Sequence, residues 1–215
     1  DHVFDDYPGG GTYLFNSEAN VANYPLRISG STRGTIGAGT GAGTVIRLAA
    51  AAGSGAACIR FTSFADLHVE RIKFLLGASA GTLNFIGLRF AELRSSSVSR
   101  CSFFGPATTS DDTTAIQFDG TGTFTGAVVV SENYISNQLR GIKILGSVTD
   151  LHITNNTFYG TLSHLSSIGI DFASADCNGC MVIGNSFKLW FRGVKSIGSG
   201  IKQIGNRFED SNPPW

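Results

Sequence analysis

Hydrophobic and polar residues alternate in short stretches along this chain. In LHITNNTFYG (residues 151–160), Leu151 and Ile153 alternate with polar neighbours, which is the period-two pattern of a half-buried strand. Asn155 and Asn156 follow, although strands disfavour asparagine, and Phe158 resumes the apolar positions on the opposite parity. The pattern therefore predicts two short strands with a tight corner between them.

The same outline recurs along most of the chain. Aligned copies give a column of apolar residues and, two positions earlier, a column rich in asparagine: Phe74, Phe103, Ile135, Phe158, Phe187 and Phe208 in the first, and Ile72, Cys101, Asn133, Asn156, Asn185 and Asn206 in the second. A glycine-apolar-x-apolar motif accompanies the copies, as in GLRF (87–90), GIKI (141–144) and GIDF (169–172). Each unit therefore predicts three short strands in about 25 residues.

A unit of this size cannot bury its apolar face alone, so the units must stack and pair each strand with its copy one turn on. The predicted fold class is all-β, a parallel β-helix of about seven or eight turns. Asparagine tolerates the left-handed backbone that a corner needs, and stacked side-chain amides can bond from turn to turn. We expect a single domain over residues 1–215, with irregular entry turns (1–57), regular turns (58–210) and a tail (211–215).

Composition adds few constraints to this prediction. Apolar residues make up 42% and charged residues 15%, and 16 basic residues balance 16 acidic ones, so no global charge points to nucleic acid or a membrane surface. No run of 18 apolar residues occurs, which excludes an inserted helix. Among the four cysteines only Cys177 and Cys180 are close, and one CxxC is weak evidence for a metal. We expect no metal or cofactor, and buried thiols rather than a local disulfide, although a disulfide stays open for an extracellular protein.

The segments ITNNTFYG…GIDF and VSENYISN…GIKI carry the outline I-x-x-N-x-F…G-I-x-I. In this the chain resembles the pectate-lyase-like right-handed parallel β-helix superfamily, and the opening GGGTYLF…TVI is closest to its phage tailspike and polysaccharide-depolymerase domains. The resemblance implies a right-handed helix and a glycan-related function, but no stretch matches the Gly-His-Gly segment of polygalacturonases. The chain also lacks the amphipathic N-terminal cap of such helices, which suggests the β-helical portion of something larger.

The motif strands predict a column of outward side chains about 4.8 Å apart, made of Arg60, Arg89, Gln117, Lys143, Asp171 and Lys195. Four of the six are basic, so this face could bind an acidic polysaccharide, with Arg89, Gln117, Lys143 and Lys195 as the candidate binding residues. Trp190 is a further candidate, because an aromatic face can stack on a sugar ring. The alternatives are a solvated, charged sheet face and a tryptophan that packs against a subunit or cap.

Asp171, Asp119 and Asp112 are the candidate catalytic residues. A glycosidase needs two carboxylates roughly 5–9.5 Å apart, and Asp119 with Asp171 would fall near the upper end of that range. A lyase would need a base and a cation beside a uronate, which Lys143 and Arg89 could supply. Aspartates are also common in turns, so the alternative is that these carboxylates have no catalytic role.

The leading functional hypothesis is the β-helical body of a phage tailspike-like protein that binds, and if it is an enzyme cleaves, a bacterial surface polysaccharide. Two alternatives stay open: a secreted lyase or glycoside hydrolase unrelated to phage, and a non-enzymatic structural spike or capsid-decoration module. The resemblance implies a virion or extracellular location. It also implies a homotrimer, which exposed apolar stretches at FLLG (74–77) and LWF (189–191) would favour.

Overall fold

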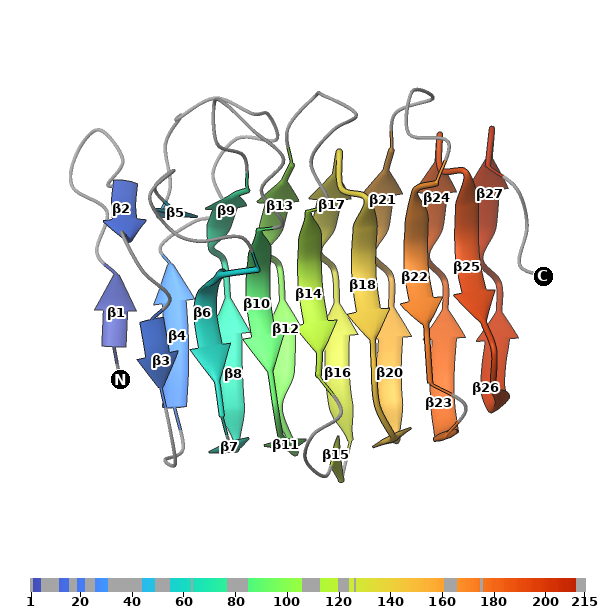
Figure 1. The fold of residues 1–215 in the computed structure, drawn as a ribbon, viewed down its shortest axis with the longest axis horizontal. Helices are drawn as coiled ribbons and strands as arrows, with labels where there is room; N and C mark the ends of the chain where they lie inside the picture. Colours follow the sequence, from blue (N-terminus) through green and yellow to red (C-terminus); the bar gives the residue numbers. More distant parts are fainter. Residues whose placement is uncertain are drawn as a thin grey trace.

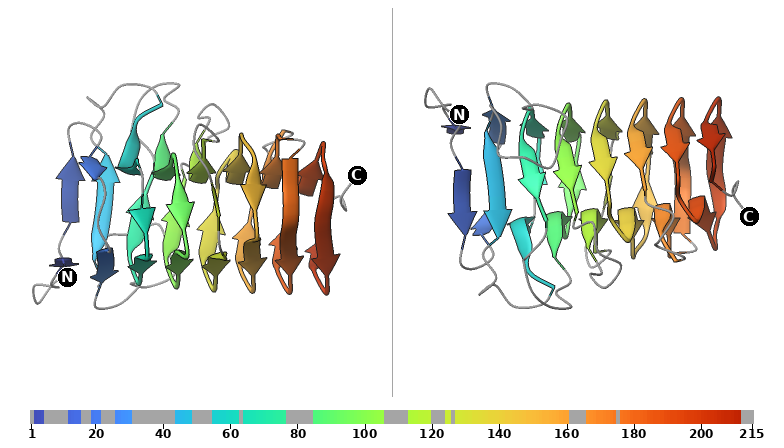
Figure 2. Two further views of the ribbon diagram at one scale, coloured as in Figure 1. Left: turned by 90° about the horizontal axis from the view of Figure 1, so that it is seen from below. Right: turned by 90° about the horizontal axis from the view of Figure 1, so that it is seen from above.

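The computed structural model describes residues 2–4, 12–15, 19–21, 26–30, 44–48, 55–62, 64–76, 85–105, 113–119, 124–125, 127–160, 166–174 and 176–211. In these residues the chain coils into successive turns, and each strand pairs in parallel with strands of the adjoining turns (Figure 1). The described ends of the chain lie at opposite ends of the stack (Figure 2). The molecule is an all-β parallel β-helix, which confirms the predicted fold class. Within the described ranges no helix is long and apolar enough to cross a membrane.

The strands form three long parallel sheets. The seven-stranded sheet contains β3 (Ala19–Val21), β6 (Ala57–Phe61), β10 (Ile86–Phe90), β14 (Thr114–Phe118), β18 (Arg140–Ile144), β22 (Ile168–Phe172) and β25 (Arg192–Ser196). The eight-stranded sheet contains β2 (Thr12–Phe15), β5 (Val45–Leu48), β9 (Lys73–Leu75), β13 (Ser102–Phe104), β17 (Tyr134–Ser136), β21 (Thr157–Tyr159), β24 (Ser186–Lys188) and β27 (Arg207–Glu209).

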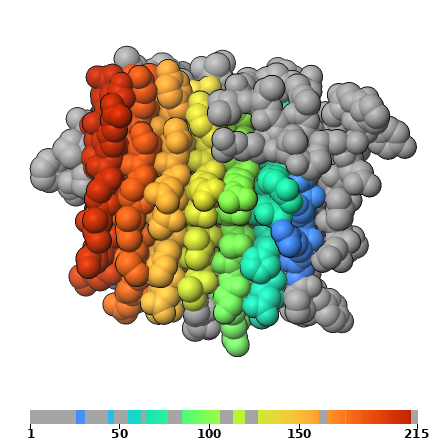
Figure 3. All heavy atoms as spheres, turned by 180° about the vertical axis from the view of Figure 1, so that it is seen from behind, coloured from blue at the N-terminus to red at the C-terminus, as the bar shows by residue number. Residues whose placement is uncertain are grey.

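The twelve-stranded sheet has eight main strands and four two-residue strands at its edge. The main strands are β1 (His2–Phe4), β4 (Leu26–Gly30), β8 (Leu67–Glu70), β12 (Ser97–Ser99), β16 (Val128–Ser131), β20 (Leu151–Thr154), β23 (Asp176–Ile183) and β26 (Ser199–Ile204). The short strands are β7 (Phe64–Ala65), β11 (Leu93–Arg94), β15 (Phe124–Thr125) and β19 (Val148–Thr149). These four strands were not predicted, since the sequence pattern indicated only three strands in each turn. On the side opposite to that of Figure 1, the described turns lie side by side as narrow ridges (Figure 3).

The interior consists of columns in which each turn contributes one residue. The predicted apolar column forms in full, because Phe74, Phe103, Ile135, Phe158, Phe187 and Phe208 are paired one after another in the eight-stranded sheet. The rings of Phe158 and Phe187 are stacked with centroids 4.7 Å apart, and those of Phe187 and Phe208 lie 5.1 Å apart. A second stack joins Phe61, Phe90 and Phe118 in the seven-stranded sheet. Stacked rings at this spacing bury large apolar areas and fix the register of the turns.

The glycine of the glycine-apolar-x-apolar motif is a packing requirement. A Cβ at Gly141 would lie 2.3 Å from the carbonyl oxygen of Gly169 and 2.9 Å from the ring of Phe158. Gly87, Gly169 and Gly193 meet the Phe column in the same way. Where Ile135 replaces a phenylalanine in the column, the motif carries Ala115 instead of glycine. At these four turns the ring of the Phe column therefore leaves room only for glycine, whereas the first regular turn carries Cys58 at the motif position together with Phe74.

The corners use left-handed backbone and an amide ladder, but on different residues of the Asn-Asn pair. Asn155 has a φ of 53°, whereas Asn156 holds the buried position in the ladder. The Oδ1 atom of Asn156 accepts hydrogen bonds from both the backbone N and the Nδ2 of Asn133, each at 3.0 Å. The amide ladder is thus confirmed, and the left-handed conformation belongs to the residue before it.

Candidate functional site

The candidate site lies on the outer face of the seven-stranded sheet. Its strands pair in register at Arg60, Arg89, Gln117, Lys143, Asp171 and Lys195, so the predicted polar column forms. The residues on either side of Lys143, Ile142 and Ile144, are fully buried, which sends the Lys143 side chain outward. We call this set of six residues the polar column.

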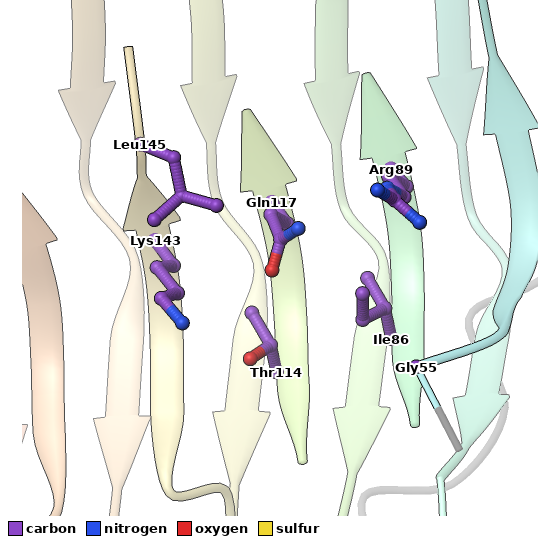
Figure 4. Close-up of a pocket in the computed structure, with 7 residues that line it drawn as sticks. All are labelled: Gly55, Ile86, Arg89, Thr114, Gln117, Lys143 and Leu145. Carbon is purple, nitrogen blue, oxygen red and sulfur yellow. The ribbon is translucent and has the colours of Figure 1, made fainter. Parts of the chain in front are cut away.

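Three members of the polar column meet in one hollow of about 230 Å³. Figure 4 shows Arg89, Gln117 and Lys143 on three neighbouring strands, on the same side of the sheet. The complete lining is Gly55, Ile86, Arg89, Thr114, Gln117, Lys143 and Leu145. The hollow therefore combines two cations and an amide with two apolar side chains, Leu145 on the side of Lys143 and Ile86 on the side of Arg89.

Asp119 organises one side of this hollow without lining it. Its carboxylate accepts a hydrogen bond from Nε of Arg89 at 2.6 Å and one from Nε2 of Gln117 at 2.7 Å. The Asp119 side chain is almost completely buried, whereas the Arg89 side chain is partly exposed. A paired, partly exposed guanidinium of this kind keeps other N–H groups for a ligand, because arginine has five donors in a fixed plane.

Asp171 is buried, although we expected it to be exposed on this face. The residue is 3% exposed, and its carboxylate accepts a hydrogen bond from Nε of Arg140 at 3.2 Å. Nζ of Lys195 lies 3.6 Å from the other carboxylate oxygen. Asp171 does not line the hollow, and neither does Lys195. The structure thus places this carboxylate inside a cluster of cations that it neutralises.

Lys143 differs from the other cations of this region. Arg89, Arg140 and Lys195 each lie within ion-pair distance of Asp119 or Asp171. Lys143 is half-buried and makes no hydrogen bond or ion pair with the described part of the chain. A lysine that lines a hollow without a carboxylate partner leaves a local positive charge there, which favours an anionic ligand.

The sequence prediction missed Arg140, Thr114 and the apolar lining residues Ile86 and Leu145. Arg140 immediately precedes the GIKI motif, and its guanidinium also donates to the carbonyl of Ser166 at 2.9 Å. The sequence contained a signal for them, because Thr114 and Arg140 are paired one residue before the glycine-apolar-x-apolar motif and three residues before the polar column. The motif that defined the sequence alignment starts at the next residue, so it does not include these two positions.

Two further predicted residues do not join the hollow. Trp190 is 1% exposed and its ring packs edge-on against Phe158 at 6.2 Å, so it is part of the core and offers no stacking face to a sugar. This corrects the prediction of a binding role, and the reason is that the residue closes the interior beside Gly160. Asp112 lies outside the described residues.

The apolar stretches cited for a trimer are mostly buried. In FLLG, Phe74 and Leu76 are completely buried and Leu75 is half-buried. In LWF, only Phe191 is exposed, at 40%. The argument for a trimer from these stretches is therefore wrong, since their side chains serve the core of a single chain. The homotrimer itself stays a prediction.

The four cysteines are buried, and no two of them are joined by a disulfide. Burial raises the pKa of the Cys101 thiol to about 12, which makes it inert at neutral pH. Cys177 and Cys180 are close enough to share a hydrogen bond, which raises the pKa of Cys177 and lowers that of Cys180. In the described ranges no cluster of three or more His, Cys, Asp or Glu side chains could hold a metal ion.

Comparison of the chain with protein-family models, with curated proteins and with solved structures gave no match. The functional argument therefore rests on the fold and on the geometry of the hollow.

Proposed function

We propose that the hollow on the seven-stranded sheet binds an acidic polysaccharide, and that the chain is the β-helical body of a phage tailspike-like protein of the pectate-lyase-like superfamily. The observation that carries the binding proposal is Lys143, a cation without an ion-pair partner in the described residues, beside Arg89 and Gln117 in one hollow. An extended glycan can follow the polar column, because a parallel β-helix presents equivalent side chains at about 4.8 Å intervals. The apolar side chains of Leu145 and Ile86 at the two sides of the hollow can contact the carbon atoms of a sugar ring.

Cleavage of the glycan has weaker support than binding. Asp119 and Asp171 both accept hydrogen bonds from arginines, and neither carboxylate lines the hollow in which a glycan would lie. We assign both residues to holding Arg89 and Arg140 in position. Asp171→Asn should therefore leave the rate of any glycan cleavage close to that of the unchanged protein, while it lowers protein stability. A product assay on a glycan that the protein binds measures the rate.

The binding proposal is tested by charge-matched alanine variants. Lys143→Ala should weaken binding of polygalacturonate, alginate or hyaluronan fragments about ten-fold, because a hydrogen bond to a charged group contributes about 1.5–3 kcal/mol. Lys202→Ala is the control, since Lys202 is exposed on β26 in a different sheet. Calorimetry with each glycan, and with neutral dextran, gives the affinities. Equal losses in the two variants, or equal binding of dextran, would contradict a specific anionic site at this hollow.

The homotrimer and the virion location belong to the same proposal. Sedimentation of the chain over a range of concentrations tests the oligomer, and a monomer at every concentration would count against a trimer formed by these residues. Labelling of phage particles with an antibody against the chain tests the location.

A further inference from the structure

Cations recur at every second position of the polar column. Arg89, Lys143 and Lys195 lie on β10, β18 and β25, while Gln117 and Asp171 occupy the strands between them. Neighbouring strands of a sheet are about 4.8 Å apart, so the backbone positions of successive cations are about 10 Å apart. Two sugar rings of an extended glycan span a similar length. One cation therefore faces every second sugar of a chain that follows the column.

Gln117 separates the two cations of the hollow and is held by Asp119. Nε2 of Gln117 donates to one oxygen of the Asp119 carboxylate at 2.7 Å, and Nε of Arg89 donates to the other oxygen at 2.6 Å. An ionised carboxylate only accepts hydrogen bonds, so this contact fixes which end of the Gln117 amide is the nitrogen. The amide oxygen is thereby turned away from Asp119, and Figure 4 shows it directed toward Thr114.

The middle of the hollow therefore offers neutral oxygen atoms between two cations. Oε1 of Gln117 has no hydrogen-bond partner among the described residues, and Thr114 with its hydroxyl lines the same hollow. An amide oxygen only accepts hydrogen bonds, so it favours a hydroxyl or an N–H group of a sugar. It disfavours a carboxylate, which has no hydrogen to donate at neutral pH. The hollow thus has the order cation, acceptor, cation over three turns.

The next two turns continue this alternation. Asp171 follows in the polar column, and its carboxylate is neutralised by Arg140 and Lys195. A ligand carboxylate over Asp171 would meet a carboxylate that already occupies these cations, whereas Lys195 one turn further is again a cation. Arg60 lies one turn before β10, outside the hollow, and breaks the alternation at that end. The alternation therefore holds from β10 to β25.

We infer that the glycan carries a carboxylate on every second sugar, as a uronate that alternates with a neutral sugar bearing a hydroxyl or acetamido N–H group. One uronate lies over Arg89, whose N–H groups that are not bound to Asp119 donate to it, and the next uronate lies over Lys143. The neutral sugar between them donates to Oε1 of Gln117. This inference rests on the proposed function, because it names the class of acidic polysaccharide that the hollow binds.

Calorimetry with oligosaccharides of equal length separates this inference from the proposed function. Hyaluronan and unsulfated chondroitin carry one carboxylate in each disaccharide, whereas oligogalacturonate carries one on every sugar. We expect at least one of the two alternating glycans to bind about ten-fold more tightly than oligogalacturonate despite its lower charge, because oligogalacturonate leaves the Gln117 oxygen without a donor. Equal or tighter binding of oligogalacturonate would overturn the inference and leave the proposed function standing. If none of these glycans binds more tightly than neutral dextran, both are overturned.

A variant of Gln117 tests the central position of the hollow directly. Gln117→Met keeps the length of the side chain but removes the amide oxygen, so it should weaken binding of the alternating glycan about five-fold and change the affinity for oligogalacturonate less than about two-fold. Gln203→Met is the control, since Gln203 is exposed on β26 in a different sheet. Equal losses for both glycans, or no loss for either, would overturn the inference. If thermal unfolding shows that Gln117→Met does not fold, the glycan comparison on the unchanged protein decides.

Discussion

Two stacked columns of polar residues in this molecule have opposite characters. The corner column repeats one residue, with Asn133, Asn156 and Asn185 buried and bonded to one another. The polar column changes residue at almost every turn, from Arg89 to Gln117 to Lys143, and it includes a hollow and an unpartnered cation. A polar residue that is repeated from turn to turn can make its hydrogen bonds with its own copies in the neighbouring turns. A polar residue that differs from its copies needs another partner, and this is why we propose the variable column as a binding site.

Breaking the corner column should have the largest effect. Asn156→Ala removes the acceptor of two donors of Asn133 and the donor to the carbonyl of Val130. Each buried polar group left without a partner costs about 1–3 kcal/mol, so we expect the free energy of unfolding to fall by about 3 kcal/mol or more. Urea unfolding measures it. Asn155→Gly is the matched control, because Asn155 is exposed and left-handed, and it should change stability by less than about 0.5 kcal/mol.

The motif glycines form another repeated column and should be nearly as intolerant. Gly141→Ala brings a Cβ against the carbonyl of Gly169 and the ring of Phe158, and such overpacking costs about 1–3 kcal/mol. Adding Phe158→Ile to this variant reproduces the natural combination of Ala115 with Ile135, so the double variant should regain part of the loss. Thermal unfolding of both variants checks this. A double variant less stable than the sum of the two single changes would refute the steric link.

A smaller loss is expected on the variable column. Asp171→Asn removes the charge that neutralises Arg140 and Lys195, whose side chains are partly exposed and therefore screened by water. We expect a loss of about 1–2 kcal/mol in the free energy of unfolding. Asp176→Asn is the control on an exposed carboxylate that accepts a hydrogen bond from Ser147, and it should be close to neutral. If Asp171→Asn leaves stability unchanged, the carboxylate has no structural role and a catalytic role regains support.

The smallest effect concerns pH and the outer face of the twelve-stranded sheet. The hydrogen bond from Arg27 is the main reason that the pKa of Glu70 is lowered from its ordinary value of 4.5. A lowered carboxyl pKa stabilises the fold above about pH 4.5, and this contribution is lost as the pH falls through the folded value. The Arg27 side chain is 57% exposed, so the contribution should stay below about 1 kcal/mol. Glu70→Gln should remove this part of the loss of stability between pH 5 and pH 3, and Arg27→Met should remove less of it, because Ser29 and Arg71 also lower the pKa of Glu70. Urea unfolding at several pH values measures both, and a larger effect of Arg27→Met than of Glu70→Gln would contradict this account.

The repeated columns could be predicted from the sequence because their signal is summed over six copies. Phe158 and Asn156 are each ambiguous alone, but their alignment with Phe187 and Asn185 decides both the inward direction and the corner. The sequence did not show that Asn155 takes the left-handed backbone and Asn156 the ladder position, because asparagine tolerates both positions.

The site was less predictable because it depends on residues that do not repeat. The burial of Asp171 follows from Arg140, which lies outside the motif that defined the alignment. Trp190 stands between Leu189 and Phe191 in a short connection, and nothing in its spacing distinguishes a core residue from a surface platform. Only the packing of its ring against Phe158 decides the matter.

The register of the turns also limits how this surface can change in evolution. A single inserted residue inside a strand would reverse the side chains that follow it, whereas a whole duplicated turn keeps every column aligned. The face of the sheet that carries the polar column can therefore lengthen or shorten only by whole turns, in steps of about 4.8 Å. Such a surface has a fixed spacing between its side chains, so added turns would lengthen it for a longer ligand without moving the side chains of the turns already present.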